Sequence, residues 1–221
     1  SVGRNRGSKE KISKKVSLIT AKKTELDLPQ TSADLLYYGG GVRIQKSQGG
    51  GGSPVIRGFE GNRVLLVIDG VRMNNAIYRS GHLQNAITID PNTLERTEVI
   101  FGPASVGYGS DALGGVVHFY TRTPKINNEK KWIVMGSNSL NTILNHNINN
   151  LNFERSKENW ASFTSFSYSN FGNIIMGRNR THGFENWGLN KHSLISKKIN
   201  EENFINKNPT VQKNTNYSQF D

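Results

Sequence analysis

The stretch from Glu95 to Thr121 constrains the fold most, because two strand-like runs enclose a segment of small residues. Residues 95–101 read Glu-Arg-Thr-Glu-Val-Ile-Phe, and residues 115–121 read Gly-Val-Val-His-Phe-Tyr-Thr. Gly, Ala, Ser and Pro dominate the residues between them. Small side chains let backbone segments approach closely, and glycine allows turns with positive φ. This pattern predicts two strands that flank a tightly packed irregular connection.

The composition favours a β-rich, loop-rich protein. Only 34% of the 221 residues are hydrophobic, 23 are glycine, and the mean hydropathy is −0.56. No run of about 18 apolar residues occurs, so a transmembrane helix is not expected, whereas a membrane β-strand needs only about 9–11 residues of weak alternation. The sequence has no cysteine, which excludes disulfide bonds and thiolate metal sites.

Positive charge concentrates at the beginning of the chain, within a formal net charge of +11. A basic arm of this kind binds polyanions or forms a solvated edge. Aromatic residues are missing from the basic run, so it offers no platform for stacking bases, and nucleic acid is not an expected partner. The start of the chain has no apolar signal-peptide core, which indicates a processed chain or a fragment. The basic residues are Arg4, Arg6, Lys9, Lys11, Lys14, Lys15, Lys22 and Lys23, against the single acid Glu10.

The first half of the chain alternates short strands with turn signals. Asp69-Gly70 lies between two β-rich runs and predicts a type I′ hairpin. Thr31 or Ser32 is a suitable N-cap for a short helix, which would end near the glycine run 39–41. The other expected elements are strands at 12–20, 42–45 and 54–57, a hairpin over 63–73, a helical turn over 93–97 and a strand at 97–101.

The composition changes near Pro124. Two long segments with imperfect alternation follow, residues 130–148 and 160–171, joined by a short polar link at 154–159. A longer polar loop, 178–191, precedes the next strand-like run. Aromatic residues near strand ends, with a short turn on one side and a long loop on the other, are typical of outer-membrane barrels.

Two patterns that resemble catalytic motifs do not support an enzyme. Residues 107–112 match G-x-G-x-x-A, but that nucleotide motif needs a following helix, and a strand-like run follows instead. Ser105 is one residue out of position for a G-x-S-x-G nucleophile turn. The five histidines lack the spacing of zinc ligands. We therefore predict that the chain is not an enzyme.

Several ordered motifs resemble the plug domain of TonB-dependent outer-membrane receptors, over roughly residues 8–123. One departure is His118, where the family usually has Asn. The matching motifs, in order, are Ser32–Leu36, Gly41-Val42, Pro54–Gly58, Val67–Arg72, Asp90-Pro91, Leu94–Val99, Gly102-Pro103, Tyr108-Gly109 and Gly114–Val117.

The resemblance implies an α+β plug domain, a small mixed sheet with short helices, followed by the first antiparallel strands of a transmembrane β-barrel. The expected division is 1–123 for the plug and 124–221 for an incomplete barrel of about two to three strands. It implies outer-membrane localisation and energy supplied by TonB, through an N-terminal segment not in this chain. The chain is then the N-terminal part of a longer receptor. The alternative is a truncated plug-like binding module without transport activity.

The resemblance places ligand-binding residues in the loop 74–88, between the hairpin and Asp90. Tyr78, Arg79 and His82 lie within five positions there, and His82 is the expected axial ligand of haem iron. No tightly bound cofactor is expected, since haem would be the transported ligand. A surface lipoprotein or a haemoprotein is the expected partner that delivers it. The rival interpretation is a ferric siderophore bound by Tyr78, Arg79 and Gln84.

The resemblance also implies that charged residues on or beside the plug strands make polar contacts with the barrel wall, which break during transport. An exposed charge on a half-solvated sheet is the alternative for each. These residues are Arg57, Arg72, Glu95, Arg96 and Glu98.

Overall fold

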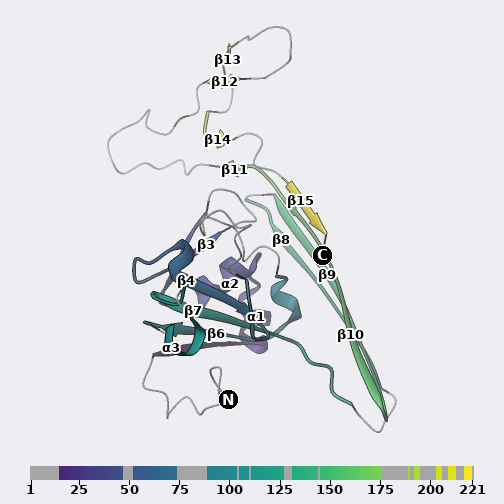
Figure 1. Cartoon of the computed structure of the whole chain (residues 1–221). Coiled ribbons are helices and arrows are strands. Elements are labelled where there is room, and N and C mark those ends of the chain that lie inside the picture. The colour runs from purple at the N-terminus through teal and green to yellow at the C-terminus, as the bar shows by residue number, and fades with distance from the viewer. Residues whose placement is uncertain are drawn as a thin grey trace.

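The computed structural model describes most of the chain up to Ile175 and short pieces beyond it. A sheet-containing N-terminal unit lies beside three long strands that slope past one side of it (Figure 1). The described residues are 15–46, 52–73, 89–103, 105–109, 111–126, 131–143, 145–175, 189, 192–194, 203–205, 209–212 and 217–220.

The N-terminal unit is built on a five-stranded mixed sheet with the order β1-β6-β7-β4-β5. The pair β4–β7 is parallel, and the pairs β1–β6, β6–β7 and β4–β5 are antiparallel. This agrees with the small mixed sheet predicted for a plug, and we call this N-terminal unit the plug. The strands are β1 (Val16–Thr20), β4 (Val64–Ile68), β5 (Val71–Arg72), β6 (Leu94–Phe101) and β7 (Gly115–Thr121).

Two short helices lie against one face of the sheet, α1 (Ala21–Asp27) and α2 (Ser32–Tyr38). The predicted cap of α2 is confirmed, since the Thr31 hydroxyl accepts a hydrogen bond from the Asp34 N–H over 3.1 Å. The helix ends where Gly40 and Gly41 take positive φ values of 76° and 77°, a conformation that glycine adopts without a steric penalty.

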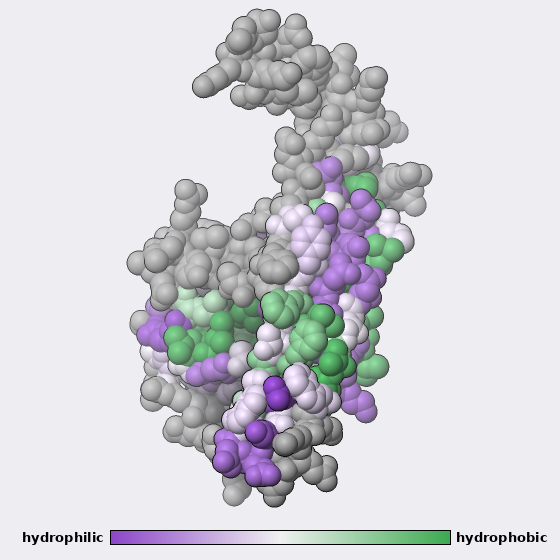
Figure 2. All heavy atoms as spheres, turned by 90° about the vertical axis from the view of Figure 1, so that its right-hand side faces the viewer, coloured by the Kyte–Doolittle hydropathy of each residue, from purple (hydrophilic) through white to green (hydrophobic). Residues whose placement is uncertain are grey.

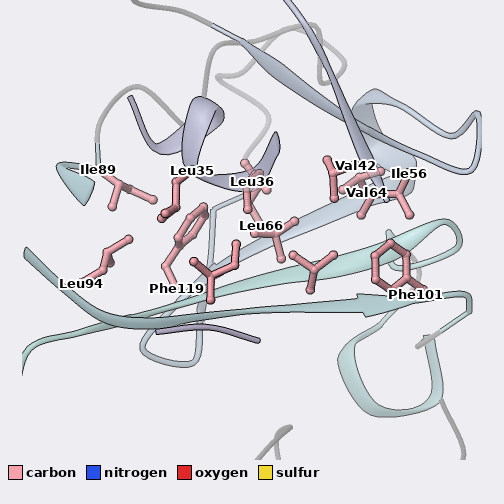
Figure 3. Packing of buried hydrophobic residues seen from close by; sticks show 13 residues of the cluster. Leu35, Leu36, Val42, Ile56, Val64, Leu66, Ile89, Leu94, Phe101 and Phe119 are labelled. Atoms are coloured by element: carbon pink, nitrogen blue, oxygen red, sulfur yellow. The ribbon is translucent and has the colours of Figure 1, made fainter. Parts of the chain in front are cut away.

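The main core lies between α2 and the sheet. Leu35 and Leu36 of α2 are fully buried and face Leu66 and Phe119, as Figure 3 shows. Strand alternation brings a second, smaller apolar cluster to the opposite face of the sheet, where Val116 is fully buried. Both faces of the central strands are therefore covered.

The predicted hairpin over 63–73 is confirmed. Asp69 and Gly70 have φ values of 47° and 89°, and the register pairs Ile68 with Val71 across this two-residue turn. A second antiparallel hairpin joins β2 (Val42–Gln45) and β3 (Ser53–Ile56).

The helical turn predicted over 93–97 is wrong in position. The turn occupies Pro91–Thr93, and β6 already begins at Leu94. The Asp90 side chain caps the turn by accepting from the Asn92 N–H over 2.8 Å, and proline is preorganised for the first position of a helical turn. Two further short turns are η2 (Gly61–Arg63) and α3 (Ser105–Tyr108), and β7 rather than a helix follows the G-x-G-x-x-A pattern.

Three long antiparallel strands form the wall beside the plug: β8 (Lys131–Asn141), β9 (His146–Lys157) and β10 (Trp160–Phe171). The predicted single segment 130–148 is wrong, because a turn that begins at Thr142 divides it into β8 and the start of β9. Asn145 there has a φ of 53°, and the asparagine-rich sequence gave no sharp break in alternation. The link between β9 and β10 is shorter than the predicted 154–159, because it consists of residues 158–159 alone.

The pieces beyond residue 175 form short strand pairs. β15 (Tyr217–Phe220) pairs with β10, so the wall sheet has the order β15-β10-β9-β8. The predicted loop 178–191 lies outside the described residues apart from Leu189. None of the helices in the described ranges has the length and apolarity needed to cross a membrane. The other pairs are β11 (Ile174–Ile175) with β14 (Val211–Gln212), and β12 (His192–Leu194) with β13 (Asn203–Ile205).

Candidate functional site

The predicted ligand-binding loop, 74–88, lies outside the described residues, and Tyr78, Arg79, His82 and Gln84 lie in it. Its flanks are well fixed. The Met73 N–H donates to the Leu66 carbonyl over 2.9 Å, and Met73 packs against the main core. Ile89 belongs to the same core and is only 6% exposed. Both ends of the loop are therefore held on the α2 side of the sheet.

A buried carboxylate, Glu98, lies in the middle of β6 on the opposite face of the sheet. Its side chain has no exposed area, its Oε1 accepts from Arg96 Nε over 3.0 Å, and its Oε2 accepts from the Tyr120 hydroxyl over 3.3 Å. The Arg96 guanidinium also lies 3.7 Å from the centre of the Tyr120 ring. The register of β6 and β7 places His118 opposite Glu98. We call Arg96, Glu98, His118 and Tyr120 the Glu98 cluster.

The charges in the Glu98 cluster follow from burial and from the carboxylate. Burial acts to lower the pKa of Arg96, but the hydrogen bond and charge of Glu98 outweigh it, and the pKa is raised. Burial and then the charge of Glu98 raise the pKa of Tyr120 to about 12. Burial lowers the pKa of His118 although Glu98 and Asp69 oppose this effect. At neutral pH the cluster therefore holds one ion pair and two neutral rings.

His118 connects the Glu98 cluster to the hairpin turn at Asp69-Gly70. Its Nε2 accepts from the Gly70 N–H over 3.1 Å, so the neutral ring carries its proton on Nδ1. The ring stacks on Tyr120 with centroids 4.0 Å apart. Asp69 holds the same turn by accepting from the Thr121 N–H over 2.9 Å. The histidine that replaces the family's usual asparagine thus supplies a hydrogen-bond acceptor to the turn.

The other residues predicted to contact a barrel wall have neighbours within the plug. Arg72 pairs with Asp111 over 2.6 Å and ties the hairpin to the small-residue segment. Arg57, with a φ of 51°, has its guanidinium 5.8 Å from the Phe101 ring centre. Glu95 lies 3.8 Å from Arg96. Contact of these side chains with a wall stays a prediction.

Asp90 joins the plug to the strand wall, a role that the sequence did not indicate. One carboxylate oxygen caps the Pro91–Thr93 turn, and the other accepts from Asn150 Nδ2 over 3.0 Å and from the Ser167 hydroxyl. Asn150 and Ser167 are 6% and 5% exposed, and Asn150 Nδ2 lies 2.7 Å from Ser167 Oγ. The Asp-Pro pair signals the capped turn, but no local signal reveals partners 60 and 77 residues away.

Three further contacts link the plug to the wall. Gln30 Oε1 and His146 Nδ1 lie 2.9 Å apart. The Arg122 guanidinium lies 5.5 Å from the Phe163 ring centre and donates weakly to the Met135 sulfur at 3.7 Å. The inner face of the wall therefore meets the plug through a mixture of polar, aromatic and thioether groups.

A cavity of about 300 Å³ lies between the plug and strands β8 and β9. Its lining combines Glu25 and Arg122 of the plug with Met135, Asn150 and Asn152 of the wall. In the described part of the chain, no group of three or more His, Cys, Asp or Glu side chains could hold a metal ion. The cavity therefore lies at the plug–wall contact with a lining of both polar and apolar groups, and those residues place no metal site around it.

The two faces of the wall differ in polarity. Alternate residues point away from the plug, and most of the large hydrophobic ones among them are exposed, such as Trp132 at 62% and Val134 at 58%. Those pointing toward the plug include the buried Asn150, Asn152 and Ser167. Figure 2 views the molecule from the right-hand side of Figure 1, where the wall lies, and shows hydrophobic patches beside hydrophilic ones. Apolar-out and polar-in alternation is the pattern of a transmembrane β-barrel strand.

A mixed-sheet domain against the polar inner face of such strands defines the class of outer-membrane barrel whose lumen is filled by a plug. Residues 8–116 match the TonB-dependent Receptor Plug Domain family, and this part of the chain belongs to that family. Members of the family are outer-membrane transporters and not enzymes. The predicted outer-membrane localisation and the predicted lack of enzymatic activity are therefore confirmed.

Curated relatives align over about half of this chain. The vitamin B12 transporter BtuB of Vibrio vulnificus is 35% identical over 125 residues, which cover 56% of this chain and 20% of the relative. A hemin receptor of Yersinia pestis is 39% identical over 92 residues, covering 41% and 13%. The ferrichrome outer membrane transporter/phage receptor of Escherichia coli is 30% identical over 120 residues, covering 52% and 15%. The chain therefore spans a fifth or less of the length of these three relatives.

Solved structures share the fold over both the plug and the wall. The copper transporter OprC superposes with a TM-score of 0.62 at 21% identity, over 75% of this chain and 25% of that one. The siderophore receptor PirA from Acinetobacter baumannii gives 0.54 at 23% identity, over 76% and 26%. These overlaps extend past residue 116 and confirm a plug followed by the first strands of a receptor barrel.

Proposed function

We propose that this chain is the N-terminal part of a receptor that imports an iron source, with haem as the favoured ligand and energy supplied through TonB. The observation that supports haem as the ligand is that Tyr78, Arg79 and His82 lie within five positions of the sequence, in the loop 74–88. The described flanks Met73 and Ile89 support it, because both are fixed in the main core. The segment 74–88 therefore begins and ends beside residues that are held on the α2 side of the sheet.

Each side chain has a role suited to haem. His82 would ligate the iron through an imidazole nitrogen, Tyr78 would pack on or ligate the porphyrin, and Arg79 would pair with a propionate. The similarity to the hemin receptor of Yersinia pestis supports this choice. The similarities to BtuB and to the ferrichrome transporter leave a cobalamin or a siderophore as competing ligands.

An absorbance titration of the whole purified protein tests the ligand. Haemin should give a saturable Soret shift that His82→Ala abolishes or moves. Gln84→Ala is the matched control, since Gln84 belongs to the siderophore interpretation and not to the haem one. If His82→Ala leaves the Soret shift unchanged while Gln84→Ala weakens binding of a ferric chelate, the siderophore interpretation replaces the haem proposal.

We also propose the domain boundary near residue 124, with the plug before it and the wall after it. TonB would act through a segment that precedes the plug, and a surface lipoprotein or haemoprotein would deliver the ligand. The contacts of Asp90 with Asn150 and Ser167 support a plug that rests against the wall before transport. A TonB-dependent uptake assay with the complete receptor tests this assignment, because a free-standing module would show binding without uptake.

A further inference from the structure

Charge on the outward face of the wall is confined to one end. Among the described outward-facing residues of β8, β9 and β10, only Arg155 and Lys157 are charged, and both are basic. Both lie beside the two-residue turn at 158–159. The rest of the face is apolar, aromatic, or neutral and polar.

The Arg155 guanidinium is held between two indole rings. It lies 4.5 Å from the Trp132 ring centre and 5.3 Å from that of Trp160. The register pairs Trp132 directly with Arg155, and Trp160 with Lys157. Cation–π contacts occupy the faces of a guanidinium and leave its in-plane N–H groups available. No hydrogen bond or ion pair engages those donors within the part of the chain that the structure describes.

The position of this pair of tryptophans fits the boundary of a membrane. Short turns of outer-membrane barrels lie on the periplasmic side, and tryptophan is enriched where lipid headgroups meet the hydrocarbon layer. Further along the same face, Val134, Leu151 and Phe166 present an exposed or partly exposed apolar surface that suits acyl chains. A ligand that fits both parts carries an anionic head and an apolar tail.

We propose that Arg155, bracketed by Trp132 and Trp160, binds the phosphate of an anionic phospholipid, with Lys157 adding a second positive charge. A planar guanidinium donates two parallel hydrogen bonds to phosphate oxygens, which an ammonium cannot do. The proposal rests on the outward face being in contact with lipid, as the receptor assignment requires, and is independent of the transported ligand.

The test uses the whole protein that carries this chain, purified in neutral detergent, with lipid binding followed by native mass spectrometry. The probes are a phosphatidylglycerol, a diacylglycerol with the same tails, and inorganic phosphate. We expect saturable binding of phosphatidylglycerol alone. Arg155→Gln should weaken it roughly tenfold, as expected for the loss of one charge-assisted contact. The affinity of Arg155→Lys should fall between those of the parent and Arg155→Gln, because lysine keeps the positive charge but lacks the planar guanidinium that donates two parallel hydrogen bonds.

Arg43→Gln is the matched control, because it removes one exposed positive charge from the plug strand β2 and should leave lipid binding unchanged. Equal affinity of Arg155→Gln and the parent for phosphatidylglycerol would overturn the proposal. Equal binding of diacylglycerol would show that the tails alone are recognised, and equal binding of inorganic phosphate would show a free-anion site. The haemin titration of Arg155→Gln should be unchanged, so failure of either proposal is recognised separately.

Discussion

Arg96 and Glu98 form an ion pair in which the carboxylate is completely buried and the guanidinium is partly open to solvent. The Nε–Oε1 distance is 3.0 Å, and the exposed fractions of the two side chains are 27% and 0%. Two residues apart on one strand, they point to the same face of the sheet. Because the pair holds a charge away from water, removing one partner costs far more than removing both.

Replacement of Arg96 by methionine should therefore destabilise the plug sheet. We expect a loss of about 2–4 kcal/mol, below the usual cost for a fully buried pair because solvent reaches the guanidinium. The double variant Arg96→Met/Glu98→Gln should recover most of that loss. Hydrogen exchange of the β6 amides in the whole protein measures the opening free energy. Arg72→Met is the control, since its pair with Asp111 is 45% and 32% exposed and is worth less than about 1 kcal/mol.

The stability of the plug should fall in mild acid because of His118. Burial lowers its pKa in the folded protein below the ordinary 6.5, so between these two values the unfolded chain binds more protons. Stability therefore decreases as the pH falls below about 6.5 and levels off below the folded pKa. His118→Asn keeps an acceptor for the Gly70 N–H and should flatten this dependence. Exchange measured at pH 7.5 and 5.5 tests it; parallel pH profiles for both proteins would contradict it.

Tyr120 should make the stability of the plug fall as the pH rises in the alkaline range. Its pKa is raised from 10.0 to about 12, so between these values the folded protein keeps a proton that the unfolded chain has lost. Stability should decrease as the pH rises from 10 to 12. Tyr120→Phe should weaken this decrease, and ultraviolet titration of the phenolate absorbance in the parent and variant measures the pKa directly.

Asp90→Asn should separate the two roles of this side chain. One amide oxygen can still cap the turn, but the amide nitrogen then faces the Asn150 amide, which donates in the parent. We expect a loss of about 1–3 kcal/mol in protection at the plug–wall contact, with the turn itself retained, whereas Asp90→Ala loses both. Hydrogen exchange of residues 89–93 and 148–152 reports each role. Asn147→Ala, on the outward face, is the control and should change neither segment.

Gly115→Ala should destabilise the sheet, because an added Cβ would lie 2.6 Å from the Ile100 carbonyl oxygen. Neither backbone can yield without breaking the β6–β7 ladder, so we expect a cost of about 2 kcal/mol or more. Gly107→Ala is the matched control, since no atom lies within 4 Å of its added Cβ. It should be neutral or gain up to about 1 kcal/mol from the better helix former in α3. Thermal unfolding of both variants measures the two effects, and an equal melting temperature for Gly115→Ala and the parent would contradict the prediction.

The local signals in the sequence predicted much of the plug, and they failed where repetition blurred them. Thr31 and Asp69-Gly70 act through the backbone angles of their own neighbours, so the cap and the hairpin could be read directly. The asparagine-rich run around Asn145 offers no strong alternation, and the boundary between β8 and β9 was therefore missed. Glu98 was predicted to contact the barrel wall, but its complete burial was not predicted, because a charged residue on a strand is usually exposed.

The sequence by itself determined the order of short strands, caps and turns, because those depend on residues within a few positions of one another. Only the tertiary structure decided that Asp90 meets Asn150 and Ser167, that His118 accepts from Gly70, and that Arg155 lies between Trp132 and Trp160. These contacts follow from strand register and from the docking of the plug on the wall. A shift of one residue in register would turn every such side chain to the other face, and no local pattern encodes that choice.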